Sequence, residues 1–130
     1  MKRVVDGDTL LFGTGERVRL IGVDTPENKH PSKPVEQFGK EASTFTRNLV
    51  EGKRVRLEYD PSNAARAHKD QYGRTLAYIF LDDGMLLNAE IIRQGYGHAF
   101  ARYPFSRMEE FRRLESEARD ARRGLWATYP

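Results

Sequence analysis

The sequence predicts a small α+β domain in which five short strands form a barrel and helices pack against it. Several segments are apolar-rich or alternate between apolar and polar residues, as strands do. Two other segments carry apolar residues at helical spacing, one near the middle of the chain and one near its end. The 130 residues fit one domain, which we expect to span 1–130.

The first two strands are expected to form a hairpin. Val4 to Phe12 is apolar-rich, and the triplet Gly13-Thr14-Gly15 is typical of a turn. Arg17 to Val23 follows, where alternation places Arg19 on the face opposite to its two apolar neighbours.

A helix and a third strand come next. Asn28 to Pro34 is rich in proline and charge and is expected to be an exposed loop. Glu36 to Val50 has helical periodicity and ends before Gly52. Lys53 to Tyr59 alternates as a strand with one solvated face, and Asp60 to Tyr72 is polar and predicts a long surface loop.

The fourth and fifth strands flank a short helix. Arg74 to Leu81 predicts a strand that turns at Asp83-Gly84. Asn88 is expected to cap a helix ending at Gly95, and His98 to Ala101 predicts the last strand.

The C-terminal helix is predicted to begin at a capping box, because Ser106 is followed three residues later by Glu109. It should end at Gly124, after which Leu125 and Trp126 fold back onto the core. Five strands avoid exposed edges most simply as a closed or partly open barrel of the OB type. The predicted fold is therefore a five-stranded OB-fold β-barrel with three α-helices.

Composition sets broad limits on function. The formal charge of +3 and the sequence pI near 9.3 mildly favour an anionic partner, but on charge alone a mixed solvated surface is the preferred explanation. No cysteine is present, so thiolate chemistry and disulfides are excluded. The longest apolar run, Leu76 to Leu81, is far shorter than the ~20 residues of a membrane span, so we expect no membrane partner. The sequence leaves the oligomeric state open, and a monomer is the default expectation.

The N-terminal sequence is compatible with two localisations of the protein. Met1-Lys2-Arg3 is followed by only two apolar residues before Asp6, so no export signal is recognisable. We expect either a secreted or periplasmic protein whose signal is absent from this chain, or a cytoplasmic one.

One cluster of charged residues predicts chemistry. The first hairpin brings Asp8 near Asp24, with Arg19 between them in sequence and Glu27 three residues beyond. Two carboxylates in one site repel each other unless a cation or proton joins them, and oxygen ligands suit a hard metal ion. Since a guanidinium suits a phosphate, the cluster indicates phosphoryl chemistry.

Each part of this cluster also has a structural reading. Asp6-Gly7-Asp8 is compatible with a plain turn or bulge, and Asp24 to Glu27 with a plain loop. Arg19 and Arg74 are compatible with solvated strand positions unless both point at one pocket. The histidines do not lie at zinc-ligand spacing: His30, His68 and His98.

Nearly the whole chain, from Val4 to Trp126, is similar to the staphylococcal-type nuclease family, the thermonucleases. The order and spacing of several short segments carry the resemblance: Val5-Asp6-Gly7-Asp8-Thr9, Arg19 to Glu27, Lys29-His30-Pro31, Phe38 to Ala42, Asp70 to Tyr78, and Leu87 to Glu90. It implies an OB barrel with three helices. It also implies calcium-dependent, sugar-nonspecific hydrolysis of DNA and RNA phosphodiester bonds, favouring single-stranded or denatured strands and leaving 3′-phosphates.

The resemblance also implies roles for the acidic residues. Asp8 and Asp24 match the carboxylates that hold Ca²⁺, and Thr25 supplies a backbone carbonyl. Glu27 matches the general base for the attacking water. Asp6 is expected to support these ligands from behind.

Other positions match substrate contacts. Arg19 and Arg74 correspond to the pair that binds the scissile phosphate, Tyr72 and Tyr103 to nucleotide-contacting tyrosines, and Lys33 to the loop beside the site. The chain departs from the best-known member at two positions that affect nucleotide affinity: Ala101, where that member has a tyrosine, and Gln71, where it has a lysine.

The alternative is a noncatalytic module that binds nucleic acid or a protein partner on the same barrel. Such a module is expected to lack one or more of the acidic or arginine positions. All five are present, which favours the enzyme: Asp8, Arg19, Asp24, Glu27 and Arg74.

Overall fold

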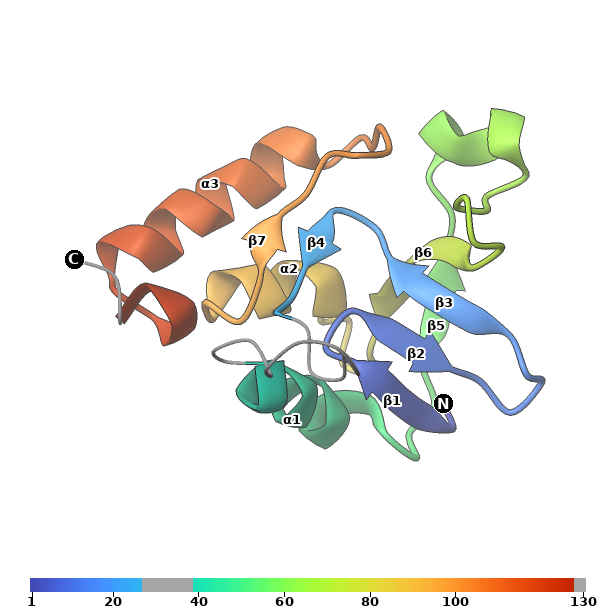
Figure 1. Ribbon diagram of the computed structural model, residues 1–130, viewed down its shortest axis with the longest axis horizontal. Helices are drawn as coiled ribbons and strands as arrows, with labels where there is room; N and C mark the ends of the chain where they lie inside the picture. Colours follow the sequence, from blue (N-terminus) through green and yellow to red (C-terminus); the bar gives the residue numbers. More distant parts are fainter. Residues whose placement is uncertain (27–38, 128–130) are drawn as a thin grey trace, which may run out of the picture.

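The computed structural model describes residues 1–26 and 39–127. Five strands form the main sheet in the order β1-β2-β3-β6-β5, and two further strands pair separately (Figure 1). The strands are β1 (Arg3–Asp6), β2 (Thr9–Leu11), β3 (Arg17–Leu20), β4 (Val23–Asp24), β5 (Arg56–Glu58), β6 (Thr75–Phe80) and β7 (His98–Ala99). The helices are α1 (Gly39–Val50), α2 (Leu87–Arg93) and α3 (Met108–Asp120), with 3₁₀ turns η1 (Pro61–Arg66) and η2 (Gly124–Ala127).

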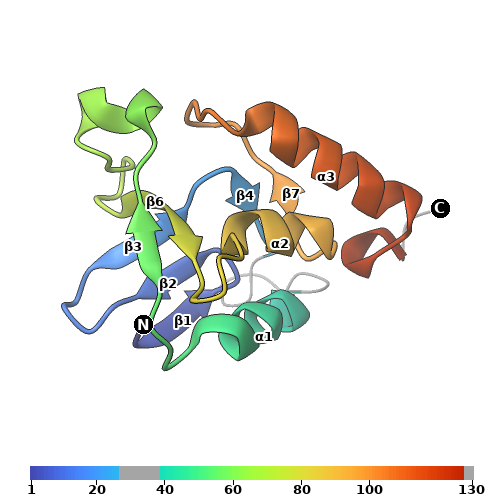
Figure 2. The same cartoon turned by 180° about the vertical axis from the view of Figure 1, so that it is seen from behind.

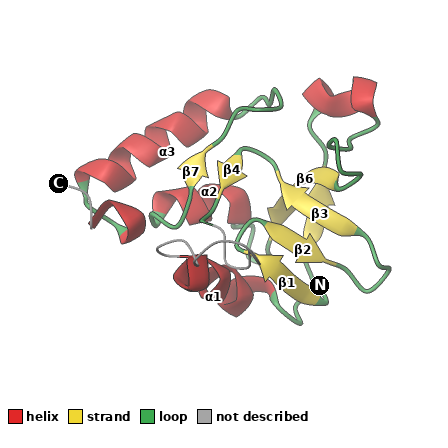
Figure 3. Cartoon of the chain, viewed as in Figure 1, coloured by secondary structure: helices red, strands yellow, loops and turns green. Residues whose placement is uncertain are grey.

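Strand pairing confirms the predicted α+β class and an OB-fold-like barrel. β1, β2 and β3 form an antiparallel meander, β3 pairs parallel with β6, and β5 pairs antiparallel with β6. The short β4–β7 pair joins the end of the hairpin to the segment that leads into α3 (Figure 3).

Viewed from behind, α2 lies between the sheet and α3 (Figure 2). Its fully buried side chains Ile91 and Ile92 pack with Leu20 and Ile79 of the strands. Leu125 also packs into the interior, as predicted. No helix within the two described ranges is long and apolar enough to cross a membrane.

The first predicted strand is in fact two strands. β1 and β2 pair with each other, and Gly7 and Asp8 form the turn between them. A Cβ on Gly7 would lie 2.8 Å from Oγ1 of Thr25, so glycine allows the turn to approach the end of β4. The turn reading of Asp6-Gly7-Asp8 therefore holds, and the same turn places Asp8 beside Thr25.

The segment after β5 was predicted as a surface loop, which is wrong for part of it. Asp60 is buried and accepts hydrogen bonds from Tyr78 Oη (2.5 Å), Ser106 N (2.7 Å), Ser106 Oγ (3.0 Å) and Ser62 N (2.9 Å). Burial alone would raise the pKa of Asp60, but these hydrogen bonds outweigh it and hold the pKa well below its usual range. Asp60 therefore connects η1 to β6 and to the start of α3.

Two predicted helix caps are also wrong. Ser106 bonds Asp60 instead of capping α3, which begins at Met108 without a side-chain cap. Asn88 is fully buried inside α2, where its Oδ1 accepts from Ile79 N and its Nδ2 donates to the carbonyls of Ile21 and Ala77. Buried backbone groups need partners, and Asn88 supplies them where α2 crosses the strands.

Candidate functional site

Arg19 lies at the centre of the site. On β3 it pairs with Thr9 of β2 on one side and Leu76 of β6 on the other. It is only 8% exposed, so the solvated reading of this arginine is wrong. Its Nη1 donates to the carbonyls of Leu20 (2.9 Å) and Val23 (2.5 Å), which fixes the plane of the guanidinium.

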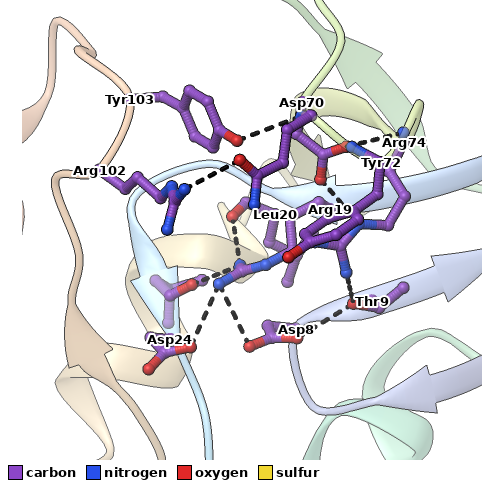
Figure 4. A network of polar contacts seen from close by, with 12 residues as sticks. Asp8, Thr9, Arg19, Leu20, Asp24, Asp70, Tyr72, Arg74, Arg102 and Tyr103 are labelled. Carbon is purple, nitrogen blue, oxygen red and sulfur yellow. Dashed lines mark hydrogen bonds and ion pairs between the residues drawn. The ribbon is translucent and has the colours of Figure 1, made fainter.

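Two carboxylates meet the other end of this guanidinium. Nη2 of Arg19 lies 3.2 Å from Oδ1 of Asp24 and 3.5 Å from Oδ2 of Asp8 (Figure 4). The formal charges of these three side chains sum to −1. The side chain of Asp24 is 51% exposed.

Asp8 is held rigidly. It is buried, its Oδ2 accepts from Thr25 N (3.0 Å), and its Oδ1 accepts from Thr9 Oγ1 (3.1 Å). Asp6 is the last residue of β1 and pairs with Thr9 across the turn that contains Asp8. The hairpin thus brings Asp8 and Asp24 together, as their positions in the sequence predicted, and Thr25, which only the family resemblance singled out, lies beside Asp8.

The donor chemistry fits a hard cation. Two carboxylates and the backbone carbonyl of Thr25 are oxygen ligands, the type that calcium takes in flexible geometry. In the described part of the chain no group of three acidic, histidine or cysteine side chains forms a complete metal site. The predicted base Glu27 and the predicted loop residue Lys33 lie outside the described residues.

Arg74 lies just before β6, and its side chain is held by Asp70. The polar sequence around Asp70 predicts a surface residue, which is wrong. Asp70 accepts from Arg74 Nε at 2.7 Å, and its other oxygen accepts from the backbone N–H groups of Tyr72 and Arg74, both at 2.9 Å. The Asp70 side chain is 1% exposed. Nη1 of Arg74 also reaches Thr9 Oγ1 at 3.5 Å, which links Arg74 to the Asp8 turn.

Both arginines line one pocket of about 140 Å³. Its walls come from β3, from the turn before β6 and from the segment after β7. The lining residues are Arg19, Leu20, Ile21, Gly22, Gln71, Tyr72, Arg74, Leu76, Phe100, Arg102 and Tyr103. Two cationic side chains that are 55 positions apart in sequence therefore face the same space.

The two predicted tyrosines border this pocket in different ways. Tyr72 is 73% exposed, and the guanidinium carbon of Arg74 lies 5.3 Å from its ring centroid. Tyr103 is half-buried, and its hydroxyl accepts from the backbone N–H of Gln71 at 3.2 Å. Tyr72 thus offers an open ring for stacking, whereas the Tyr103 hydroxyl already has a partner in the pocket wall.

Comparison with known proteins identifies the family. The family described as "Staphylococcal nuclease homologue" matches residues 17–128, so the chain belongs to this family. It is 51% identical over 102 residues to a thermonuclease of Staphylococcus intermedius, covering 76% of this chain and 57% of the relative.

Two further relatives extend the match over almost the whole chain. A thermonuclease of Staphylococcus hyicus is 39% identical over 129 residues, covering 96% of this chain and 73% of the relative. Endonuclease YncB of Bacillus subtilis (strain 168) is 32% identical over 132 residues, covering 98% of this chain and 60% of the relative. The chain spans 57% of the length of the Staphylococcus intermedius protein.

Proposed function

We propose that this chain is a calcium-dependent nuclease that hydrolyses phosphodiester bonds in single-stranded or denatured DNA and RNA and leaves 3′-phosphates. The observation that carries the proposal is the convergence of Arg19 and Arg74 on one pocket beside Asp8 and Asp24. The names of the relatives, thermonuclease and endonuclease, support the same reaction class.

In this proposal the acidic side of the site holds the metal. Asp8, Asp24 and the Thr25 carbonyl would bind Ca²⁺, which when bound offsets charge on the phosphate oxygens. Asp8 is fixed for this role by its hydrogen bonds to Thr9 and Thr25. Asp6 supports the turn that carries Asp8.

The basic side of the site positions the phosphate. Guanidinium groups bind phosphate oxygens through two parallel hydrogen bonds, and fixed donors stabilise charge that develops during the reaction. Nε of Arg74 is held by Asp70 and Nη1 also reaches Thr9 Oγ1, so Nη2 and the second N–H of Nη1 are left to face the phosphate. Arg19 approaches from β3 with its plane set by two backbone carbonyls.

Glu27 accepts the proton of the attacking water in this mechanism, and the 5′-oxygen of the next nucleotide leaves. Tyr72 and Tyr103 contact the nucleotide from the pocket walls, and Lys33 is proposed as a further contact to the strand. Tyr72, with its exposed ring, is suited to stack on an unpaired base, since base–aromatic stacking tolerates any base.

End-labelled single-stranded DNA and RNA tests the proposal. Both should be cut with calcium and left intact with a chelator, and the new 3′ ends should accept a label only after phosphatase treatment. Binding without cleavage in calcium would instead support the noncatalytic module. Cleavage that persists in the chelator would contradict the metal requirement.

A further inference from the structure

We propose that Arg102 is a third phosphate-binding arginine of the pocket, and that it takes the phosphate that flanks the scissile one on a single nucleic-acid strand. The proposal deepens the proposed function, because it assumes that the strand lies in the pocket formed by Arg19 and Arg74. It assigns the flanking phosphate to a residue outside the catalytic cluster.

Arg102 is placed in the pocket by its neighbours. It lies in the segment between β7 and α3, it is exposed, and it lines the same pocket as Arg19 and Arg74. Its Nη2 donates to Oε1 of Gln71 at 2.9 Å. In Figure 4 Arg102 and Arg74 approach from opposite sides, with Arg19 between and below them.

Arg102 differs from the other two arginines of the pocket in its ion-pair partners. Arg19 is paired with Asp8 and Asp24, and Arg74 is paired with Asp70. Among residues 1–26 and 39–127, no carboxylate lies within ion-pair distance of Arg102; its partner Gln71 is a neutral amide. Gln71 therefore orients this guanidinium without neutralising it, and among the described residues Arg102 is the pocket arginine that has no carboxylate partner.

The wall that carries Arg102 is fixed at several points. Gln71 N donates to Tyr103 Oη, and the guanidinium carbon of Arg66 lies 4.9 Å from the Tyr103 ring centroid. Asp60 and Ser106 connect the same two segments further along. An arginine held on such a wall loses less conformational freedom on binding, which raises its contribution to affinity.

The position of Arg102 favours a neighbouring phosphate over the scissile one. Arg74 and Arg19 are tied to the Thr9 and Asp8 side of the pocket, where the metal ligands lie. Arg102 is tied to Gln71 and so lies toward Tyr103. A strand carries one phosphate per nucleotide, so a strand held at Arg19 and Arg74 presents its next phosphate along the wall of the pocket.

Equilibrium binding tests the proposal without catalysis. Fluorescent single-stranded DNA is titrated in chelator over a range of salt concentrations, with wild type, Arg102→Ala and the matched control Arg113→Ala, which removes an exposed arginine of α3. Arg102→Ala should weaken binding roughly tenfold and reduce the slope of log K against log salt by about 0.7, the value for one phosphate contact on a single strand. Arg113→Ala should leave both quantities near wild type.

Neutral methylphosphonate linkages, placed one at a time along the oligonucleotide, locate the contact. The affinity ratio of wild type to Arg102→Ala should fall toward one only when the neutral linkage replaces the phosphate next to the bound scissile position. A ratio that stays constant at every position, or an Arg102→Ala slope equal to that of wild type, would overturn the proposal. Wild-type binding without cleavage in calcium would instead overturn the proposed function and leave Arg102 as the contact to the phosphate next to the one held by Arg19 and Arg74.

Discussion

Nε of Arg74 donates a 2.7 Å hydrogen bond to Oδ2 of Asp70, and the carboxylate of Asp70 is almost completely buried. The other carboxylate oxygen accepts the backbone N–H groups of Tyr72 and Arg74. One aspartate thus fixes both the turn before β6 and the direction of the Arg74 guanidinium. A turn that the sequence presents as polar surface is in fact a support for the site.

The Asp70→Asn variant tests this support. The side-chain oxygen of asparagine can still accept the two backbone N–H groups, but its amide nitrogen cannot accept from Arg74 Nε. We expect kcat to fall roughly 100-fold, the scale of a small misplacement of a positioning group. In an Arg74→Ala background the same substitution should cause little further loss, because Asp70 acts through Arg74. An equal loss in both backgrounds would show that Asp70 serves the fold alone.

Two substitutions of Arg19 distinguish the contribution of its positive charge from that of its guanidinium geometry. Arg19→Lys retains a positive charge but lacks the fork that reaches Leu20, Val23 and two carboxylates, so activity should be lost almost as fully as in Arg19→Ala. Arg19→Ala leaves Asp8 and Asp24 without this counterion and should therefore bind calcium more tightly than wild type. Calorimetric titration with calcium measures this, and weaker calcium binding by Arg19→Ala would contradict the shared use of these carboxylates.

The features that the sequence predicts correctly are those set by residues close together in the chain. Alternation and turn residues correctly locate β3, β6 and the hairpin that brings Asp8 to Asp24, because these features are set by neighbouring residues. The roles of Asp60, Asp70 and Asn88 escape the same analysis. A polar residue in a polar stretch carries no local mark of burial, and its partners come from other elements.

The turn at Asp70 could nevertheless have been predicted from the residues next to it in the sequence. Asp70 precedes Gly73 and Arg74 in a pattern that permits an aspartate to accept backbone N–H groups two and four residues ahead, as Asx turns do. That pattern indicates a fixed turn at Asp70. It does not indicate the contact between Gln71 and Arg102, which joins residues 31 positions apart.

The Asp60 network predicts how stability depends on pH. The pKa of Asp60 is lowered in the folded protein, so its stabilising effect is present above the ordinary value of 3.8 and is lost as the pH falls through the lower folded value. Wild type should therefore lose stability as the pH falls below about 4, and Asp60→Asn should lose less over that range while being less stable at pH 7 by about 2–4 kcal/mol. Urea unfolding at a series of pH values measures both quantities, and parallel pH profiles would contradict the assignment.

The hydroxyl of Tyr78, which donates to Asp60, should affect how stability depends on pH in the alkaline range. Burial, together with the hydrogen bond and charge of Asp60, raises the pKa of Tyr78 well above its usual value of 10. Its stabilising effect is present below pH 10 and is lost as the pH rises further, since the unfolded chain then ionises first. Tyr78→Phe should remove that part of the alkaline loss, which unfolding measurements between pH 9 and 11 would detect. An unchanged alkaline profile would contradict this role of the hydroxyl.

Glu27 is the residue on which the proposed chemistry depends most directly. It follows Thr25 and Pro26, which are both buried, and the backbone N–H of Thr25 donates to Asp8 Oδ2. If Glu27 takes the proton of the attacking water, Glu27→Gln should lower kcat by roughly 10²–10⁴ while the affinity for single-stranded DNA in chelator changes little. Glu117→Gln, at an exposed position of α3, controls for the loss of one acidic charge. A Glu27→Gln enzyme within a few-fold of wild type would assign the proton transfer to another group and leave Glu27 at most a contributor to the electrostatics of the site.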